Sequence, residues 1–245
     1  EIGFLIEEHN AKEIFDDTGT FPGGEWLNKF CTGMIDRGYN KEILFSCNMR
    51  FDYLKKGIPQ IMKRAGFRKI KAGLESANQK TLDRINKGIK VQDIINGCRN
   101  AKEEGIDVHL TVMVGYPWET KDDALATLDL AKELMVKGYA EMLQSTVIIP
   151  YPGTPLYEEA LKNKWFIIDP LEYERYDMTE PVLRAPDMCP DEVMKLCQNI
   201  YKVFLSPHYI ARHILNIRSF EDIRYIIKGA KAITGHIMDF LTIRK

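Results

Sequence analysis

The sequence predicts an α/β protein in which a parallel sheet curves into a partly closed barrel. Five short apolar segments alternate with helical segments over residues 1 to about 165, which is typical of βαβ units. Polar side chains alternate with apolar ones along these segments, so one face of the sheet is hydrophilic. Strings rich in turn and cap residues follow three of the strands: Gly73-Leu74-Glu75-Ser76, Val114-Gly115-Tyr116-Pro117-Trp118-Glu119-Thr120 and Pro150-Tyr151-Pro152-Gly153-Thr154-Pro155-Leu156-Tyr157. Parallel barrels place such junctions on one rim, where their chemistry takes place.

The predicted strands are the short apolar segments bounded by polar turns. They are Lys12 to Phe15, Glu42 to Met49, Lys69 to Leu74, Val108 to Val114 and Met142 to Ile149. Helical spacing of apolar residues begins at Glu1 to Glu8 and then recurs between the strands. The later helices are predicted at Gly24 to Arg37, Tyr53 to Ala65, Gln79 to Asn86, Val91 to Glu104, Asp122 to Val136 and Leu156 to Asn163.

Three helix starts carry recognisable signals. Ser76 with Gln79, and Thr120 with Asp123, have the spacing of a capping box. Thr154 is a cap residue directly before a proline at the first helical position. Glu119 lies just before the second of these starts, where a carboxylate suits the positive end of the helix dipole, and we expect it to be structural.

After Trp165 the alternation stops. Residues 168–190 are irregular, and three or four helices follow, with caps predicted at Ser206 and Ser219. We therefore predict a barrel over residues 1–165 and a linker with a helical region over 166–245. An apolar stripe on the last helices is expected to dock on its own domain, with a neighbouring domain or a membrane surface as alternatives. The stripe consists of Ile223, Ile226, Ile227, Ala230, Ile233, Ile237 and Leu241.

Composition excludes several classes of protein. A formal net charge of -1 gives no general attraction for nucleic acid. No apolar run approaches the roughly 20 residues that span a bilayer, and no signal peptide is visible, so a soluble cytoplasmic protein is expected. The five cysteines are scattered without CxxC spacing, which predicts isolated buried thiols rather than disulfides or a zinc site.

Strand parity predicts a polar interior. Val108, Leu110, Val112 and Val114 face the helices, which sends His109, Thr111 and Met113 inward. The same argument, applied to the two preceding strands, collects four polar groups in the interior: Arg50, Lys71, Glu75 and His109. Unpaired buried charge costs several kcal/mol. A wide, incompletely closed barrel around a polar ligand would satisfy these groups.

The order and spacing of five strings give the chain its resemblance to a known family. The strings are Phe15-Asp16-Asp17-Thr18 through Phe21, Phe45-Ser46-Cys47-Asn48-Met49-Arg50-Phe51-Asp52, Gly73-Leu74-Glu75-Ser76, Val114 through Thr120, and Pro152-Gly153-Thr154-Pro155-Leu156-Tyr157. Together they resemble most of a radical S-adenosylmethionine domain, of the subgroup usually preceded by a cobalamin-binding domain.

The resemblance implies a partial (β/α)6 TIM-like barrel, here without its first strand. It implies that S-adenosylmethionine lies across the strand ends beside a [4Fe-4S] cluster and is cleaved to a 5'-deoxyadenosyl radical, or supports cobalamin-dependent methyl transfer. The expected substrate is a small or lipid-like molecule. The expected partners are an electron donor such as flavodoxin or ferredoxin and a cobalamin-binding domain upstream.

One departure from the family concerns the cluster. The family holds it with a CxxxCxxC loop after the first strand, and no such triplet occurs in this sequence. We expect that segment to lie upstream of Glu1 and this chain alone to be inactive. The alternatives are a non-radical TIM-like barrel that binds a nucleoside or phosphorylated ligand, and an inactive scaffold partner.

The resemblance also implies cofactor-binding roles. Glu75 would accept hydrogen bonds from the ribose hydroxyls or the methionyl amino group, with Ser76 beside it, and Arg50 would bind the methionyl carboxylate. Structural alternatives are a salt bridge from Glu75 to Lys71 or Arg50, a helix cap for Ser76, and an ion pair of Arg50 with Asp52 or Glu75.

Four further residues are candidates on the same grounds. Gly115 would lie next to the adenine, although Thr111 replaces the first glycine of that motif. Asp16 and Asp17 would bind the ligand's amino group or a substrate, and Pro152 would shape the rim. A turn glycine and Asx turns are the structural alternatives. No catalytic residue and no metal ligand is assigned.

Overall fold

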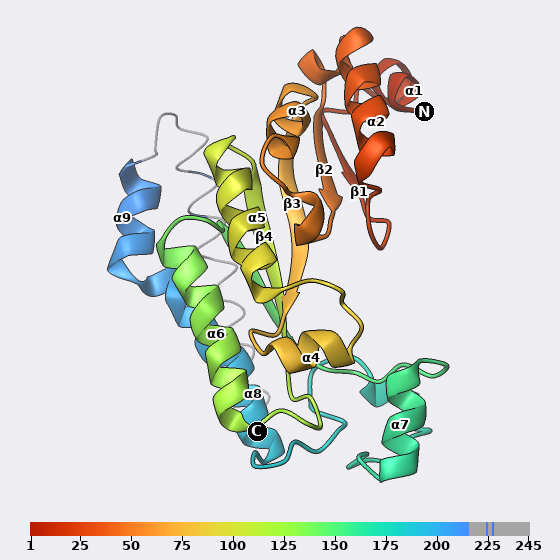
Figure 1. Ribbon diagram of the computed structural model, residues 1–245, viewed down its shortest axis with the longest axis vertical. Coiled ribbons are helices and arrows are strands. Elements are labelled where there is room, and N and C mark those ends of the chain that lie inside the picture. Colours follow the sequence, from red (N-terminus) through yellow and green to blue (C-terminus); the bar gives the residue numbers. More distant parts are fainter. Residues whose placement is uncertain (216–223, 225–226, 228–245) are drawn as a thin grey trace. The chain divides into compact units, whose positions relative to one another are not determined.

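The computed structural model describes residues 1–215 together with residues 224 and 227 (Figure 1). The chain forms two compact units. The first comprises residues 1–112 and 129–144, and the second comprises residues 113–128 and the chain from residue 145 onward. The proposed boundary at residue 165 stays a prediction.

A five-stranded sheet has the order β1-β2-β3-β4-β5, the same as the order along the chain. Its strands are β1 (Glu13–Asp16), β2 (Leu44–Asn48), β3 (Phe67–Glu75), β4 (Asp107–Val114) and β5 (Met142–Val147). The pairs β1 with β2, β2 with β3, and β3 with β4 are parallel. This confirms the predicted α/β class, because each strand returns to its neighbour through helical segments.

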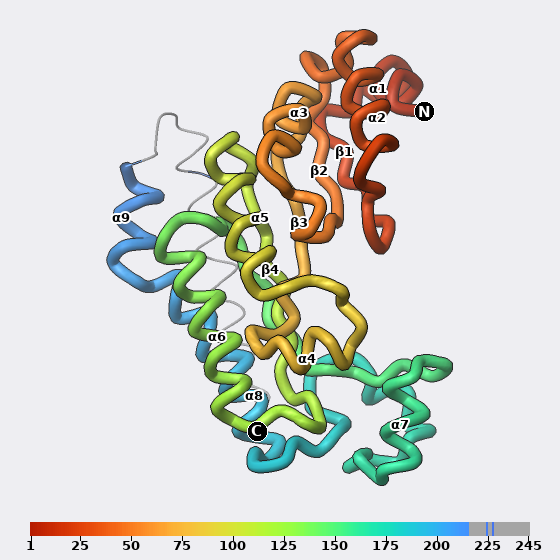
Figure 2. The backbone as a smooth tube through the Cα atoms, in the orientation of Figure 1, coloured from red at the N-terminus to blue at the C-terminus, as the bar shows by residue number. Residues whose placement is uncertain are grey.

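The helices follow the predicted order, with 3-10 turns added. They are α1 (Ile2–His9), α2 (Gly24–Asp36), α3 (Ile58–Arg64), α4 (Gln79–Arg84), α5 (Val91–Glu103), α6 (Lys121–Val136), α7 (Pro155–Asn163), α8 (Pro190–Asn199) and α9 (Pro207–Leu215), with η1 (Tyr39–Lys41), η2 (Phe51–Tyr53), η3 (Tyr173–Arg175) and η4 (Ile200–Leu205). Figure 2 shows the chain passing from β3 through α4 to α5 and β4.

One predicted helix, Tyr53 to Ala65, is wrong as a single element. The chain forms η2 first and starts α3 only at Ile58. Gly57 separates them, because its φ of 88° is left-handed and cannot continue a right-handed helix. Pro59 then lies in the first turn of α3, a position where its missing N–H costs nothing.

Strand parity is confirmed on the two strands that matter for the interior. On β4, Val108, Leu110, Val112 and Val114 are buried, whereas His109, Thr111 and Met113 are half-buried. On β3, Ile70, Ala72 and Leu74 are buried between the sheet and the helices. The apolar core of the first unit therefore lies on the helix side, and the other face of the sheet carries the polar groups.

Two of the three predicted helix starts are confirmed. The N–H of Thr120 donates to Asp123 and the N–H of Asp123 donates to Thr120 Oγ1, and the Thr154 side chain accepts from the N–H of Tyr157. The capping box at Ser76 is wrong. Asn78 caps α4 by accepting from the N–H of Lys80, whereas Ser76 Oγ accepts from the N–H of Asn78 and closes a separate turn ahead of the helix.

The cysteines are free, and four of the five are buried. The expectation of buried thiols is wrong for Cys189, which is exposed because it is the N-cap of α8. A helical region after the irregular stretch is confirmed as far as α9. The predicted cap at Ser219 and the apolar stripe lie outside the described residues, except for Ile227, which is exposed. In the part that the structure describes, no helix is both long and apolar enough to cross a membrane.

Candidate functional site

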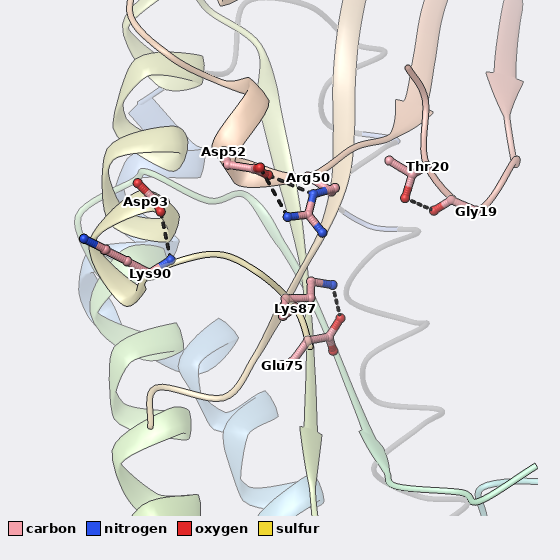
Figure 3. Close-up of polar contacts among 8 residues, drawn as sticks. All are labelled: Gly19, Thr20, Arg50, Asp52, Glu75, Lys87, Lys90 and Asp93. Atoms are coloured by element: carbon pink, nitrogen blue, oxygen red, sulfur yellow. Dashed lines mark hydrogen bonds and ion pairs between the residues drawn. The ribbon is translucent and has the colours of Figure 1, made fainter. Parts of the chain in front are cut away.

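Glu75 ends β3 with a buried carboxylate. Its side chain is 12% exposed, and Oε1 accepts a hydrogen bond from Lys87 Nζ at 2.7 Å (Figure 3). Lys87 comes from the loop between α4 and α5, so the partners considered from the sequence, Lys71 and Arg50, are both wrong. The second oxygen, Oε2, is buried and has no hydrogen-bond partner among the residues that the structure describes.

Gly73 provides the space in which that carboxylate lies. A Cβ on Gly73 would be 1.9 Å from Glu75 Oε1 and 2.9 Å from Lys87 Nζ. The backbone of Glu75 is left-handed, with φ 60°, and the pairing of β3 with β4 shifts register between Gly73 and Glu75. These two irregularities turn the Glu75 side chain back over Gly73 instead of away from the sheet.

Arg50 follows β2 and lies close to the same loop. Its Nε and Nη2 donate to the two carboxylate oxygens of Asp52 at 2.9 and 3.2 Å, the structural alternative considered from the sequence (Figure 3). Nη2 is 3.6 Å from the position that a Cβ on Gly88 would occupy. The loop that supplies Lys87 therefore runs past both Glu75 and Arg50, and it brings these two predicted residues to one region.

Asp16 and Asp17 have structural partners. Asp16 Oδ1 accepts from the N–H of Thr18 at 3.1 Å and also from its hydroxyl, which is an Asx turn. Asp17 Oδ1 accepts from Asn48 Nδ2 at 3.0 Å, and the same amide donates to the carbonyl of Thr18. The loop after β1 is thus tied to the end of β2.

Gly115 and Pro152 belong to the second unit. Gly115 has a φ of 90°, and a Cβ there would be 3.0 Å from Val193 Cγ1. The turn alone therefore requires glycine, and α8 fills the space next to it. Pro152 is exposed in the turn that precedes the Thr154 cap of α7. The roles of these residues toward a ligand stay predictions.

Lys71 and His109 lie side by side on the polar face, because they are register partners on β3 and β4. Burial, together with the charges of Lys71 and Lys69, lowers the pKa of His109 to about 4. The imidazole is therefore neutral at neutral pH, so it is a hydrogen-bonding group there rather than a cation.

Residues that sequence reasoning missed are Gly73 and Lys87. Gly73 lies two residues before Glu75 on the same strand, and this spacing, which puts both residues on one face, was a usable signal. Lys87 had no signal, because a loop lysine twelve residues after Glu75 gives no periodicity that would connect the two.

A [4Fe-4S] cluster does not fit the residues of this chain. Iron-sulfur clusters need closely placed thiolates. Among the described residues no group of three potential metal ligands occurs. Burial also raises the pKa of Cys31 to about 11 and that of Cys197 to about 12, which disfavours the thiolate form.

Comparisons with known proteins identify the family of the chain and its fold. Residues 11–131 match the Radical SAM superfamily. An uncharacterized methyltransferase of Pyrococcus horikoshii is 30% identical over 236 residues, which cover 94% of this chain and 48% of that protein. The bacteriochlorophyllide d C-8(2)-methyltransferase of Chlorobaculum tepidum is 27% identical over 72% of this chain and 40% of its own length. The chain thus spans less than half the length of these two relatives.

Solved structures share the fold. The radical S-adenosylmethionine methyltransferase TsrM from Kitasatospora setae, with cobalamin and a [4Fe-4S] cluster bound, aligns over 83% of this chain and 41% of its own, with a TM-score of 0.56 and 14% identity. Coproporphyrinogen III oxidase from Escherichia coli, described as a radical SAM enzyme, aligns over 79% of this chain and 40% of its own, with a TM-score of 0.54 and 15% identity. By its sequence match and its fold, the chain belongs to the radical SAM superfamily.

Proposed function

We propose that this chain is the S-adenosylmethionine-binding core of a radical SAM methyltransferase that acts on a small or lipid-like substrate. Two curated relatives carry the word methyltransferase in their names, and together they align with most of this chain. The structural relative TsrM is a methyltransferase with cobalamin bound, which supports cobalamin as a cofactor of the whole protein.

The observation that supports this proposal best is the orphaned oxygen of Glu75. A buried carboxylate oxygen without a donor costs free energy, roughly 1–3 kcal/mol for an unsatisfied group. A ligand that brings N–H or O–H donors to this point recovers that cost. Ribose hydroxyls and the amino group of S-adenosylmethionine are such donors, and Glu75 Oε2 is their acceptor in this proposal.

The neighbouring residues prepare Glu75 for that role. Lys87 donates to Oε1 and fixes the orientation of the carboxylate, which leaves Oε2 as the acceptor for a ligand. Arg50 carries a guanidinium group, which can bind a carboxylate through two parallel hydrogen bonds. It is held by Asp52 on one edge and binds the methionyl carboxylate with the remaining edge in this proposal.

When bound, S-adenosylmethionine supplies the methyl group or the adenosyl radical. The cluster that reduces it does not fit the five cysteines of this chain. We propose that cluster ligands, the cobalamin domain and the docking site of a flavodoxin-like or ferredoxin-like donor lie outside these 245 residues. In this proposal the chain alone is inactive, and the whole protein works in the cytoplasm.

The experiment is a binding titration of S-adenosylmethionine with the purified chain and two variants. Glu75→Gln removes the charge but keeps the shape, and we expect at least a tenfold weaker affinity, about 1.4 kcal/mol. Glu141→Gln is the matched control, because Glu141 is also a largely buried glutamate paired with a lysine, Lys102, at 2.7 Å. Equal affinity in the two variants, or no binding by the unchanged chain, would contradict the proposal.

A further inference from the structure

We propose that the polar face of the sheet binds the anionic group of an otherwise apolar substrate, a carboxylate or a phosphate, at Lys71 with Lys69 and His109 beside it. As a substrate site this inference rests on the proposed function. As an anion site it does not, since the residues that carry it are separate from Glu75 and Arg50.

The register of the sheet places these groups together. Lys69 and Lys71 are two residues apart on β3, so their side chains project from the same face. Lys71 lies between Asn48 on β2 and His109 on β4, and Lys69 lies between Ser46 and Asp107. The two lysines therefore add their charges on one surface.

The side chain of Lys71 has no hydrogen bond or ion pair in the part of the chain that the structure describes, although it is only half-exposed. Lys69 has a weaker partner, since its ammonium lies 5.6 Å from the centre of the Phe15 ring. A half-buried ammonium is poorly hydrated, so an anion that replaces its lost water is bound favourably.

Carboxylates near this face have other partners. Glu13 accepts hydrogen bonds from Arg68 and from Ser46. Glu75 is held by Lys87. Asp107, which neighbours Lys69 in register, has a pKa raised by its burial and by Glu141, with Lys102 and Arg68 acting against that rise. None of these groups compensates the charge of Lys71.

His109 lies beside Lys71 in register and adds a hydrogen-bond donor to this face. Burial is the main cause of its depressed pKa, and the charges of Lys71 and Lys69 lower it further. The neutral ring still has one N–H, which an anion held by Lys71 can accept.

Exposed apolar groups on the same face indicate the rest of the ligand. Phe15 is 40% exposed and Leu44 is 46% exposed. In the register of β1 with β2, Phe15 lies opposite Ser46 and Leu44 lies opposite Glu13. Ser46 donates to the Glu13 carboxylate, so these two positions share the polar face. The side chains of Phe15 and Leu44 therefore project from the polar face as well. Large apolar side chains on the face that carries the Lys69 and Lys71 ammonium groups suit an apolar molecule that ends in an anion.

The test follows the imidazole proton signals of the purified chain by NMR, with the His109 signal assigned through His109→Gln. Hexanoate and hexyl phosphate are the two anionic probes, and hexanamide is the neutral one. We expect a saturable shift of the His109 signal with at least one anion and none with hexanamide. Whichever anion binds more tightly identifies the carboxylate or the phosphate as the natural group.

Variants of Lys71 test whether the shift of the His109 signal depends on this lysine. Lys71→Met should weaken the anion affinity about tenfold, and Lys71→Arg should restore most of it, because the charge returns. Lys55→Met is the matched control, since Lys55 is an exposed lysine between η2 and α3, and it should change nothing.

Two outcomes overturn the inference, namely no saturable shift with either anion, or equal affinities of Lys71→Met and the unchanged chain. Either result leaves the proposed function standing if Glu75 still controls binding of S-adenosylmethionine. Conversely, an anion shift that depends on Lys71 supports the site even where S-adenosylmethionine fails to bind.

Discussion

At the scale of single residues, Gly73 decides where the Glu75 carboxylate lies. Gly73→Ala would place a methyl group 1.9 Å from Oε1, so the carboxylate must leave its present position. The atoms that must move are the ends of two flexible side chains. We therefore expect a small change in the free energy of unfolding, roughly 1 kcal/mol or less, and at least a tenfold loss of S-adenosylmethionine affinity.

The control for this substitution is Gly19→Ala. A Cβ on Gly19 meets no atom within 4 Å, so stability and affinity should both stay unchanged. The two measurements are urea unfolding and the same binding titration. If Gly73→Ala bound S-adenosylmethionine as tightly as Gly19→Ala, the position of the carboxylate over Gly73 would have no part in recognition.

His109 makes the stability of the chain depend on pH. Its pKa is about 4 in the folded chain, against about 6.5 for an unperturbed histidine. Between these values the unfolded state binds a proton that the folded state does not, so this contribution is complete above about pH 6.5 and is lost as the pH falls toward 4.

The corresponding measurement is urea unfolding of the chain and of His109→Gln at about pH 7 and about pH 5. On acidification the variant should lose roughly 1 kcal/mol less stability than the unchanged chain, a figure reduced from the full shift because the ring is only half-buried. Equal losses in the two proteins would mean that the folded imidazole titrates normally.

At the scale of elements, an aromatic cluster fixes the loop between β1 and α2. The ring of Phe21 contacts the rings of Phe30, Phe45 and Phe67 at centroid distances between 5.2 and 5.8 Å. The backbone N–H of Phe21 also donates to the carbonyl of Asn48. Phe21→Ala empties the centre of this cluster and should destabilise the chain by about 3–5 kcal/mol.

Phe15→Ala is the comparison within the same segment. Phe15 is 40% exposed and contacts Lys69 rather than the core, so its loss should cost less than about 1 kcal/mol. Thermal or urea unfolding decides between the two positions. Similar costs at both would show that the buried cluster does not hold this loop.

The same scale shows what the sequence could and could not predict. On β4, valine and leucine alternate with polar residues, and this alternation was enough to predict which face of the strand is buried, because that face depends on the strand's own side chains alone. The predicted cap of α4 at Ser76 is wrong because both Ser76 and Asn78 suit a cap, and the sequence does not show that the helix begins only at Gln79. Lys87 lies in the loop between α4 and α5 and forms its ion pair with Glu75 across the fold. The sequence contains no local pattern that predicts an ion pair between residues this far apart.

At the scale of the whole chain, the burial and spacing of the five cysteines decide whether the chain can bind an iron-sulfur cluster. Four are buried, and Cys189 is exposed at the start of α8. Burial raises the pKa of the buried thiols, among them Cys31 and Cys197, so they resist the deprotonation that metal binding requires. Their spacing along the chain also differs from a CxxxCxxC loop.

We therefore expect the 245-residue chain to form no stoichiometric cluster when it is reconstituted anaerobically with ferrous iron and sulfide. Iron and labile sulfide per chain, measured after desalting, should stay far below one cluster. Cys189→Ser should remove most of any residual iron, because an exposed thiol binds it adventitiously, whereas Cys98→Ser should not, as Cys98 lies in the core. A full cluster that survives Cys189→Ser would show that this chain supplies its own ligands, and the proposal that they come from elsewhere would fail.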